Sequence, residues 1–168
     1  KFIDAPFIEL REVDHEFIKF MQAAKKITLS VKNGQRCVIF GPSGSGKSSI
    51  LSMVAGIIEP KNGKIEISGI SPSDYIKFYA SSVSYAGPEP LLFEGTLREN
   101  LLYGAAISVS DEEIIRVLVD LNLASWLQGF GYDLSLTLGS NELATSTGQA
   151  QRLSLARAIL RQPKLLLL

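Results

Sequence analysis

Hydrophobic and polar positions alternate in two short stretches near the start of the chain. Ile8, Leu10 and Val13 mark the first stretch, residues 27–31 form the second, and an Asn-Gly turn at residues 33–34 follows. Alternation with a period of two is typical of a half-buried strand, because successive side chains point to opposite faces of a sheet. The pattern predicts a small antiparallel β lobe.

A nearly continuous apolar run at residues 36–40 comes next and leads directly into a glycine-rich loop. Such a run predicts a strand that is buried on both faces. Cys37, the only cysteine of the chain, lies in this run, so we expect it to be buried and reduced. Residues 48–55 then have helical spacing, and Gly56 is the predicted stop.

Turn residues separate this helix from further strands. Pro60 and an Asn-Gly pair at residues 62–63 predict a turn into a strand over residues 64–68. Residues 83–85 predict another strand, which ends in a proline-rich loop at residues 87–90.

The middle of the chain predicts short helices. Thr96 and Ser110 are each followed three residues later by a glutamate, which is the spacing of a capping box. We predict a helix after each of them, and the second is amphipathic over residues 114–121. The segment at about 96–141 is therefore a predicted helical subdomain.

The last part of the chain predicts one long helix and a strand. Ser146 is a candidate N-cap for a helix that runs to about Arg161, with apolar side chains along one face. Pro163 ends this helix, and four leucines at residues 165–168 predict a buried strand. The chain opens at Lys1 and stops inside the leucine run, so we expect both ends to be cut from a longer protein.

The charge balance argues against one broad class of partner. Lys and Arg together number 17, and so do Asp and Glu. The chain therefore has no bulk positive field with which to neutralise the phosphates of a nucleic acid. No run reaches the length of about 20 apolar residues that a membrane-spanning helix needs. We expect no nucleic-acid partner, and a membrane connection has to come through another segment or chain.

The glycine-rich loop carries the clearest chemistry. Residues 41–48 read Gly-Pro-Ser-Gly-Ser-Gly-Lys-Ser, which fits the pattern G-x-x-x-x-G-K-[ST] between an apolar run and a helix. Glycines allow successive backbone N–H groups to converge on phosphate oxygens, and the start of the helix adds partial positive charge. The predicted nucleotide-binding residues of this loop are Ser43, Gly44, Ser45, Gly46, Lys47, Ser48 and Ser49.

Three of these residues have distinct predicted roles toward ATP and Mg²⁺. Lys47 reaches the β- and γ-phosphates as a point charge, and the hydroxyl of Ser48 is the metal ligand. Ser49 adds a further phosphate contact. We therefore predict an α/β fold with a P-loop core and a mainly parallel sheet, a small N-terminal antiparallel β lobe and a helical insertion. The core then comprises residues 1–95 and 142–168.

From residue 8 to residue 168 the order of features resembles the ATP-binding domain of ATP-binding cassette (ABC) transporters. Residues 26–49 resemble the phosphate-loop region of that family, residues 60–69 resemble the turn and strand after it, and residues 146–168 resemble its signature helix and following strand. The resemblance implies binding of ATP and Mg²⁺, a head-to-tail dimer with a second nucleotide-binding domain, and ATP hydrolysis coupled to transport through a transmembrane domain. It also implies a place at the cytoplasmic side of a membrane, attached through a transmembrane domain outside this sequence.

The resemblance also suggests an adenine-stacking residue. In the family an aromatic ring ahead of the phosphate loop stacks on the base, and aligning residues 8–10 with the first strand of the family places Phe17 at that position. Phe20 is the alternative.

Residues 89–100 are similar to the exporter branch of the family, in which this surface receives the coupling helices of the membrane domain. The apolar pair Leu92 and Phe93 is a candidate for that contact, and the alternative is an ordinary loop anchored into the domain. Pro88 stands where the family usually has a glutamine that helps to bind magnesium and senses the γ-phosphate.

The signature of the family is altered in this chain. Residues 145–149 read Thr-Ser-Thr-Gly-Gln, whereas most members have Leu-Ser-Gly-Gly-Gln. Ser146, Gly148 and Gln149 keep the pattern and are predicted to contact the nucleotide of the partner subunit. Thr147 replaces a glycine at a place of close backbone approach, which predicts a weaker contact. We expect an asymmetric transporter in which the partner's site is impaired.

The sequence supplies no catalytic residue. In the family the leucine strand is followed by an Asp that supports magnesium and a Glu that acts on the attacking water, and this sequence stops before both. A regulatory ATP-binding domain that does not hydrolyse ATP is therefore one alternative. A soluble ABC-type ATPase that acts on nucleic acid or ribosomes is a weaker one, because such relatives often carry coiled-coil or basic insertions that are absent here.

Overall fold

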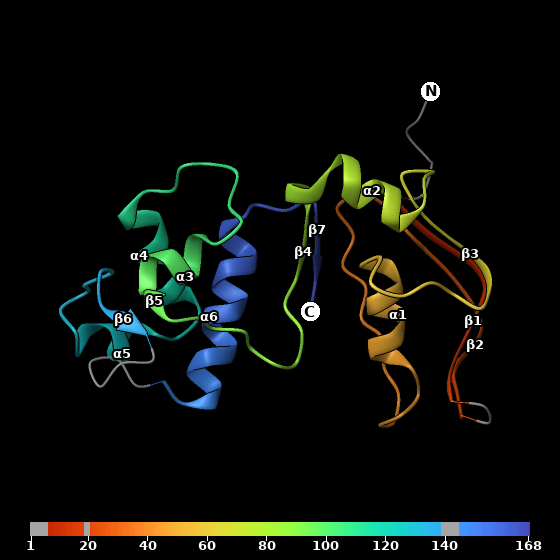
Figure 1. The fold of residues 1–168 in the computed structure, drawn as a ribbon, viewed down its shortest axis with the longest axis horizontal. Coiled ribbons are helices and arrows are strands. Elements are labelled where there is room, and N and C mark those ends of the chain that lie inside the picture. The colour runs from red at the N-terminus through yellow and green to blue at the C-terminus, as the bar shows by residue number, and fades with distance from the viewer. Residues whose placement is uncertain (1–6, 19–20, 139–144) are drawn as a thin grey trace. The chain divides into compact units, whose positions relative to one another are not determined.

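The computed structural model describes residues 7–18, 21–138 and 145–168. Of residues 15–18 and 21–25 it describes the backbone only. The chain forms two compact units, Lys1–Ala80 and Ser81–Leu168 (Figure 1).

The first unit is built on an antiparallel sheet. Its strands are β1 (Ile8–Ile18), β2 (Met21–Val31) and β3 (Asn62–Ile67), in the order β2-β1-β3. Leu10 pairs with Leu29 on one side and with Ile65 on the other, and the side chain of Leu10 is fully buried. The predicted N-terminal β lobe is confirmed, with a first strand that extends well past Val13.

Helix α1 (Lys47–Val54) contacts this sheet at β2 and β3. Its buried face consists of Ser49, Ile50, Met53 and Val54, so the apolar side of the helix contributes to the core of the unit. Gly56, at φ +65°, follows the helix in the left-handed conformation that commonly ends helices. The helix predicted after the glycine-rich loop is confirmed.

A second helix in this unit, α2 (Pro72–Phe78), was not predicted from the sequence. Ser71 caps it by accepting a hydrogen bond from the backbone N–H of Asp74 at 3.2 Å. Pro72 occupies the first turn, where its missing N–H costs nothing. The combination of Ser, Pro and Asp was a sequence signal for this helix start.

The Asn-Gly pair at residues 62–63 begins β3, whereas the sequence predicted a separate turn. Gly63 has φ +84°, and a Cβ atom there would lie 2.4 Å from the carbonyl oxygen of Glu12 in the neighbouring strand. The glycine therefore serves a close approach of two backbones beside the irregular register of β1.

The prediction of a strand at residues 36–40 is wrong. This segment has no strand conformation, and the side chains of Val38 and Phe40 are 69% and 88% exposed. Cys37 is exposed as well, which corrects its predicted burial. A strand exists only through hydrogen bonds to a neighbour, and no strand of the described residues pairs with this run. An apolar sequence alone does not supply that neighbour.

The second unit combines a helical cluster with short sheets. The 3₁₀ turn η1 (Ala80–Ser82) leads into it. Its helices are α3 (Leu97–Leu102), α4 (Asp111–Asp120), α5 (Ala124–Gln128) and α6 (Thr147–Leu160). Its strands are β4 (Val83–Tyr85), β5 (Gly95–Thr96), β6 (Thr137–Leu138) and β7 (Leu165–Leu167).

Strands β4 and β7 run parallel, with Ser84 opposite Leu166. Leu165 and Leu167 are buried, so both strands predicted at these places are confirmed. The sequence predicted a core with a mainly parallel sheet. Among the described residues, β4 and β7 are the parallel strands of that core, whereas β5 and β6 pair antiparallel.

The predicted helix starts in this unit are confirmed. Thr96 accepts a hydrogen bond from the N–H of Glu99, whose carboxylate accepts one from the N–H of Thr96. Ser146 and Gln149 form the same reciprocal box. The hydroxyl of Ser110 accepts from a backbone N–H in the first turn of α4. Each cap satisfies donors that the first turn of a helix leaves unpaired.

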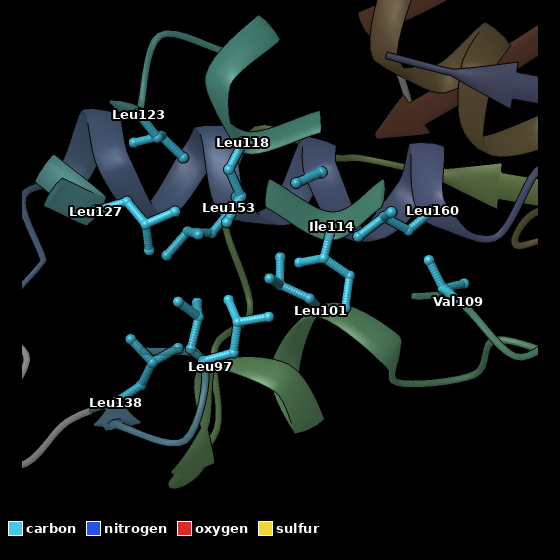
Figure 2. Packing of buried hydrophobic residues seen from close by; sticks show 12 residues of the cluster. Leu97, Leu101, Val109, Ile114, Leu118, Leu123, Leu127, Leu138, Leu153 and Leu160 are labelled. Atoms are coloured by element: carbon cyan, nitrogen blue, oxygen red, sulfur yellow. The ribbon is translucent and has the colours of Figure 1, made fainter. Parts of the chain in front are cut away.

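The core of this unit lies among its four helices (Figure 2). Side chains from α3 and α4 meet those from one face of α6, as in a small helical bundle. The buried members of this core are Leu97, Leu101, Val109, Ile114, Leu118, Leu123, Leu127, Leu134, Leu138, Leu153, Ala156 and Leu160.

None of the helices within the described ranges is long and apolar enough to cross a membrane.

Candidate functional site

The glycine-rich loop at residues 41–48 joins an exposed segment to α1 and is itself mostly exposed. Gly46 is the N-cap residue of α1 and has φ +89°, and Gly44 has φ +81°. Both are left-handed conformations that glycine adopts without strain. Within the described residues, no side chain caps the start of α1. Its first N–H groups, with the partial positive charge of the helix, are therefore placed to bind an anion.

Lys47 lies at the first position of α1, and its side chain reaches back over the loop. The ammonium Nζ donates hydrogen bonds to the carbonyl oxygens of Gly41 and Pro42, both at 2.8 Å. The loop is tight here, because a Cβ atom on Gly41 would lie 2.6 Å from Oγ of Ser45. The structure thus gathers a positive charge and the uncapped helix start on one exposed loop.

The loop hydroxyls differ in access. Ser43, Ser45 and Ser48 are exposed, whereas Ser49 is 5% exposed and belongs to the buried face of α1. The exposed hydroxyl of Ser48 is the one beside Lys47 at the helix start, which fits an oxygen ligand for Mg²⁺. The described residues contain no group of three or more His, Cys, Asp or Glu side chains that would hold a metal alone.

The predicted adenine-stacking residue lies at the edge of what the structure describes. The backbone of Phe17 belongs to β1, next to the pairing of Glu16 with Gln22, but its side chain is outside the described residues. Phe20, the alternative, is outside them altogether. Both assignments stay predictions.

The altered signature begins α6. Ser146 and Gln149 are joined by their capping box, with Oε1 of Gln149 accepting from the N–H of Ser146 at 2.8 Å. Residues 146–148 are exposed. Among the described residues, nothing lies within 4 Å of the position that a Cβ atom on Gly148 would occupy. Thr147 places its side chain on this same open surface, where the usual signature has a glycine.

A buried polar network that the sequence did not reveal holds the loop before α3. The side chain of Asn100 is 1% exposed. Its Oδ1 accepts from the N–H of Phe93 at 3.0 Å, and its Nδ2 donates to the carbonyl oxygens of Phe93 at 2.9 Å and Thr96 at 3.1 Å. One amide group therefore fixes the backbone of this loop.

Arg157 of α6 completes the network from far along the chain. Its Nε donates to the carbonyl oxygen of Asn100 at 2.6 Å, its Nη2 donates to Oδ1 of the same residue at 3.2 Å, and its Nη1 donates to the carbonyl oxygen of Leu91 at 2.6 Å. The guanidinium also lies over the ring of Phe93, 5.7 Å from the centroid. Burial lowers the pKa of Arg157, with a small opposing effect of Tyr103, and the group stays charged.

The predicted contact pair in this loop has mixed exposure. Leu92 is partly buried against the helical core, while Phe93 is 39% exposed. The exposed apolar surface includes two residues that the sequence did not single out, Leu91 at 79% and Tyr103 at 64% exposure. The rings of Phe93 and Tyr103 pack edge to face with centroids 5.2 Å apart. Pro88, also exposed, lies just before this surface.

Comparisons with known proteins agree with this geometry. A family model described as "ABC transporter" matches residues 24–168. "Leptomycin B resistance protein pmd1" of Schizosaccharomyces pombe is 33% identical over 164 residues, which are 96% of this chain and 12% of that protein. "ATP-dependent permease MDL1" of Candida albicans is 34% identical over 165 residues, 96% of this chain and 24% of that protein.

A solved structure shares the fold. It is described as "Structure of a bacterial Atm1-family ABC exporter with ATP bound" and matches this chain with a TM-score of 0.79 at 22% sequence identity. The match covers 98% of this chain and 29% of the chain in that structure. The predicted α/β P-loop fold with an antiparallel N-terminal sheet is thereby confirmed. The chain spans less than a third of each of these proteins. The chain belongs to the ABC transporter family, as an ATP-binding domain of the exporter type.

Proposed function

We propose that this domain binds Mg-ATP at residues 41–48 and, with a second nucleotide-binding domain, couples ATP hydrolysis to export across a membrane. The observation that carries the proposal is the exposed loop itself. Left-handed glycines, an uncapped helix start and Lys47 lie within a few residues of one another. Phosphate groups are the ligands that match such backbone donors and a point charge.

Lys47 has to exchange partners when the nucleotide binds. In the structure its ammonium is held by two backbone carbonyl oxygens. Phosphate oxygens carry a full negative charge and make stronger bonds to an ammonium than neutral carbonyls do. The β- and γ-phosphates therefore draw Lys47 away from Gly41 and Pro42. The hydroxyl of Ser48 would supply one oxygen ligand to a magnesium ion bound together with the nucleotide.

The test of ATP binding is the nucleotide-induced rise in the melting temperature of the chain. At a ligand concentration near 100 times Kd, binding adds about 2.7 kcal/mol of stability. For a domain of this size that corresponds to a rise of about 5–10 °C. Lys47→Ala is expected to lose most of this rise, while Lys77→Ala, which removes an exposed lysine of α2 paired with Asp74, keeps it. An equal rise in both variants contradicts the proposal.

We assign the open start of α6 to the nucleotide of the partner domain. Ser146, Gly148 and Gln149 would meet its γ-phosphate in a head-to-tail dimer, and the clear space at Gly148 supports such an approach. The side chain of Thr147 takes up part of the space through which this phosphate would approach the backbone. ATP-dependent dimers are detected by light scattering after size-exclusion chromatography, and a Gly148→Trp variant that still forms them with the same ATP dependence argues against this use of α6.

We assign the apolar surface of Leu91, Phe93 and Tyr103 to the transmembrane part of the transporter. These side chains are exposed, and the buried Asn100 network beneath them keeps the loop in a fixed conformation. Rigid apolar side chains on a surface are favourable anchors for a protein partner. Contact through this surface places the domain at the cytoplasmic face of a membrane. The names of the matched relatives, a permease and a resistance protein, support this reading for a transporter.

A second function is favoured by two residues. Pro88 and Thr147 stand at positions where the family usually has Gln and Gly, and both usual residues serve the hydrolytic cycle. The domain would then close on ATP and regulate a partner without cleaving the nucleotide itself. Measurement of phosphate release from the ATP-bound dimer separates the two functions, because turnover at this site is expected only for the first.

A further inference from the structure

Residues of the second unit line a polar cavity. It has a volume of about 270 Å³ and is bounded by β4, the loop after it, and one face of α6. Two hydroxyl side chains, Ser84 and Ser154, and two guanidinium side chains, Arg157 and Arg161, line it. Glu89, whose side chain is exposed, is the one carboxylate among the described residues that line it. The cavity therefore has an excess of positive charge and of hydrogen-bond donors.

Ser84 is the strongest sign that the cavity binds a ligand. Its side chain is 4% exposed, and its Oγ has no hydrogen-bond partner in the part of the chain that the structure describes. A buried hydroxyl without a partner is unfavourable, and most buried polar groups in folded proteins are paired. An acceptor that enters the cavity would satisfy it.

Arg157, which lines the cavity, also has hydrogen-bond donors left over. Three of its nitrogens each donate one hydrogen bond, to Leu91 and Asn100. A guanidinium has five N–H groups, so one remains on each terminal nitrogen. No carboxylate pairs with this half-buried charge among the described residues. A fixed, desolvated guanidinium with two N–H groups to spare matches an oxyanion.

Arg161 follows the last residue of α6, and its guanidinium lies close to the backbone at Gly104. A Cβ atom on Gly104, which has φ +73°, would lie 2.8 Å from its Nη1. The glycine thus leaves room for the guanidinium against the chain. Because residues 157 and 161 are one helical turn apart, both guanidiniums extend from the same face of the α6 end.

We propose that this cavity binds a single anionic oxygen group, a carboxylate or a phosphate, between Arg157 and Arg161, with the hydroxyls of Ser84 and Ser154 as further donors. Sites for drug-sized ligands occupy about 300–1,000 Å³, so the cavity takes one small group and not a nucleotide. The ligand is either a free anion or an acidic side chain of a bound protein. None of the residues assigned to this site belongs to the proposed ATP site, so the proposal does not rest on ATP binding.

The experiment uses the chain with Lys47→Ala, so that the phosphate loop does not contribute. Inorganic phosphate and N-acetyl-glutamate N-methylamide are titrated separately by isothermal titration calorimetry at low ionic strength. We expect saturable one-site binding of at least one probe. Arg161→Met should weaken it tenfold or more, and Ser84→Ala several-fold. The matched controls are Arg116→Met and Ser108→Ala, at exposed positions outside the cavity.

Thermal melting of the same variants separates binding from folding. Ser84→Ala removes an unpaired hydroxyl, so it should leave the melting temperature without ligand unchanged or raise it. Binding of phosphate alone identifies a free anion, and binding of the glutamate probe alone identifies an acidic side chain. Absence of binding for both probes overturns the proposal. Binding that persists in Arg161→Met and Ser84→Ala overturns it too.

Discussion

Replacement of Asn100 by leucine tests how much the buried network of the second unit contributes. The change keeps nearly the same volume and removes all polar atoms of the side chain. Three neutral hydrogen bonds to Phe93 and Thr96 and one to the Arg157 guanidinium are lost. A neutral bond contributes about 1 kcal/mol and one to a charged group about 1.5–3 kcal/mol. Apolar burial of leucine recovers about 1.5 kcal/mol. The expected net loss is about 3–4.5 kcal/mol.

The assay is urea unfolding followed by tryptophan fluorescence. Trp126 is the only tryptophan of the chain and lies in α5, with its ring 5.7 Å from that of Phe130. Its signal therefore reports the unit that contains Asn100. Gln151→Leu is the control, because it makes a similar change at an exposed position of α6. A loss below about 1 kcal/mol, or one equal to the control, refutes the reasoning that these bonds are an important part of the stability.

Two further predictions concern the same unit. Hydrogen bonds from the backbone and the hydroxyl of Thr96 lower the pKa of Glu99 in the folded state. The cap therefore stabilises the unit above the ordinary glutamate pKa of about 4.3, and this contribution disappears as the pH falls through the lowered folded-state value. An NMR titration checks the direction, and Glu99→Gln should remove this part of the pH dependence. Leu153→Ala, at a core position with 1% exposure, should cost about 2–5 kcal/mol in the same urea assay, and the partly exposed Leu155→Ala distinctly less.

The helix starts of this protein were predictable because their causes are local. Each capping box joins residues three positions apart, as in Thr96 with Glu99 and Ser146 with Gln149. The start of α2 carries the same kind of local signal, with Ser71 as the N-cap and Asp74 three residues later. The phosphate loop was also evident, because its glycines, its lysine and the following helix occupy consecutive positions.

The sequence failed where the deciding partner is distant in the chain. The run at residues 36–40 is as apolar as a core strand, yet it is exposed, because strand formation needs a hydrogen-bonded neighbour that hydrophobicity does not provide. The contact of Arg157 with Asn100 joins positions 57 residues apart, and neither residue shows a spacing that would indicate it.

By itself the sequence determined the family, the phosphate loop and the helix caps of this protein, because short-range spacing and backbone conformation govern them. Only the tertiary structure decided that Asn100 and Arg157 hold one loop, that Ser84 is buried with no hydrogen-bond partner among the described residues, and that two arginines line a cavity. Burial and charge pairing depend on which distant segments pack together. That information is distributed over the whole fold and is not contained in any one motif.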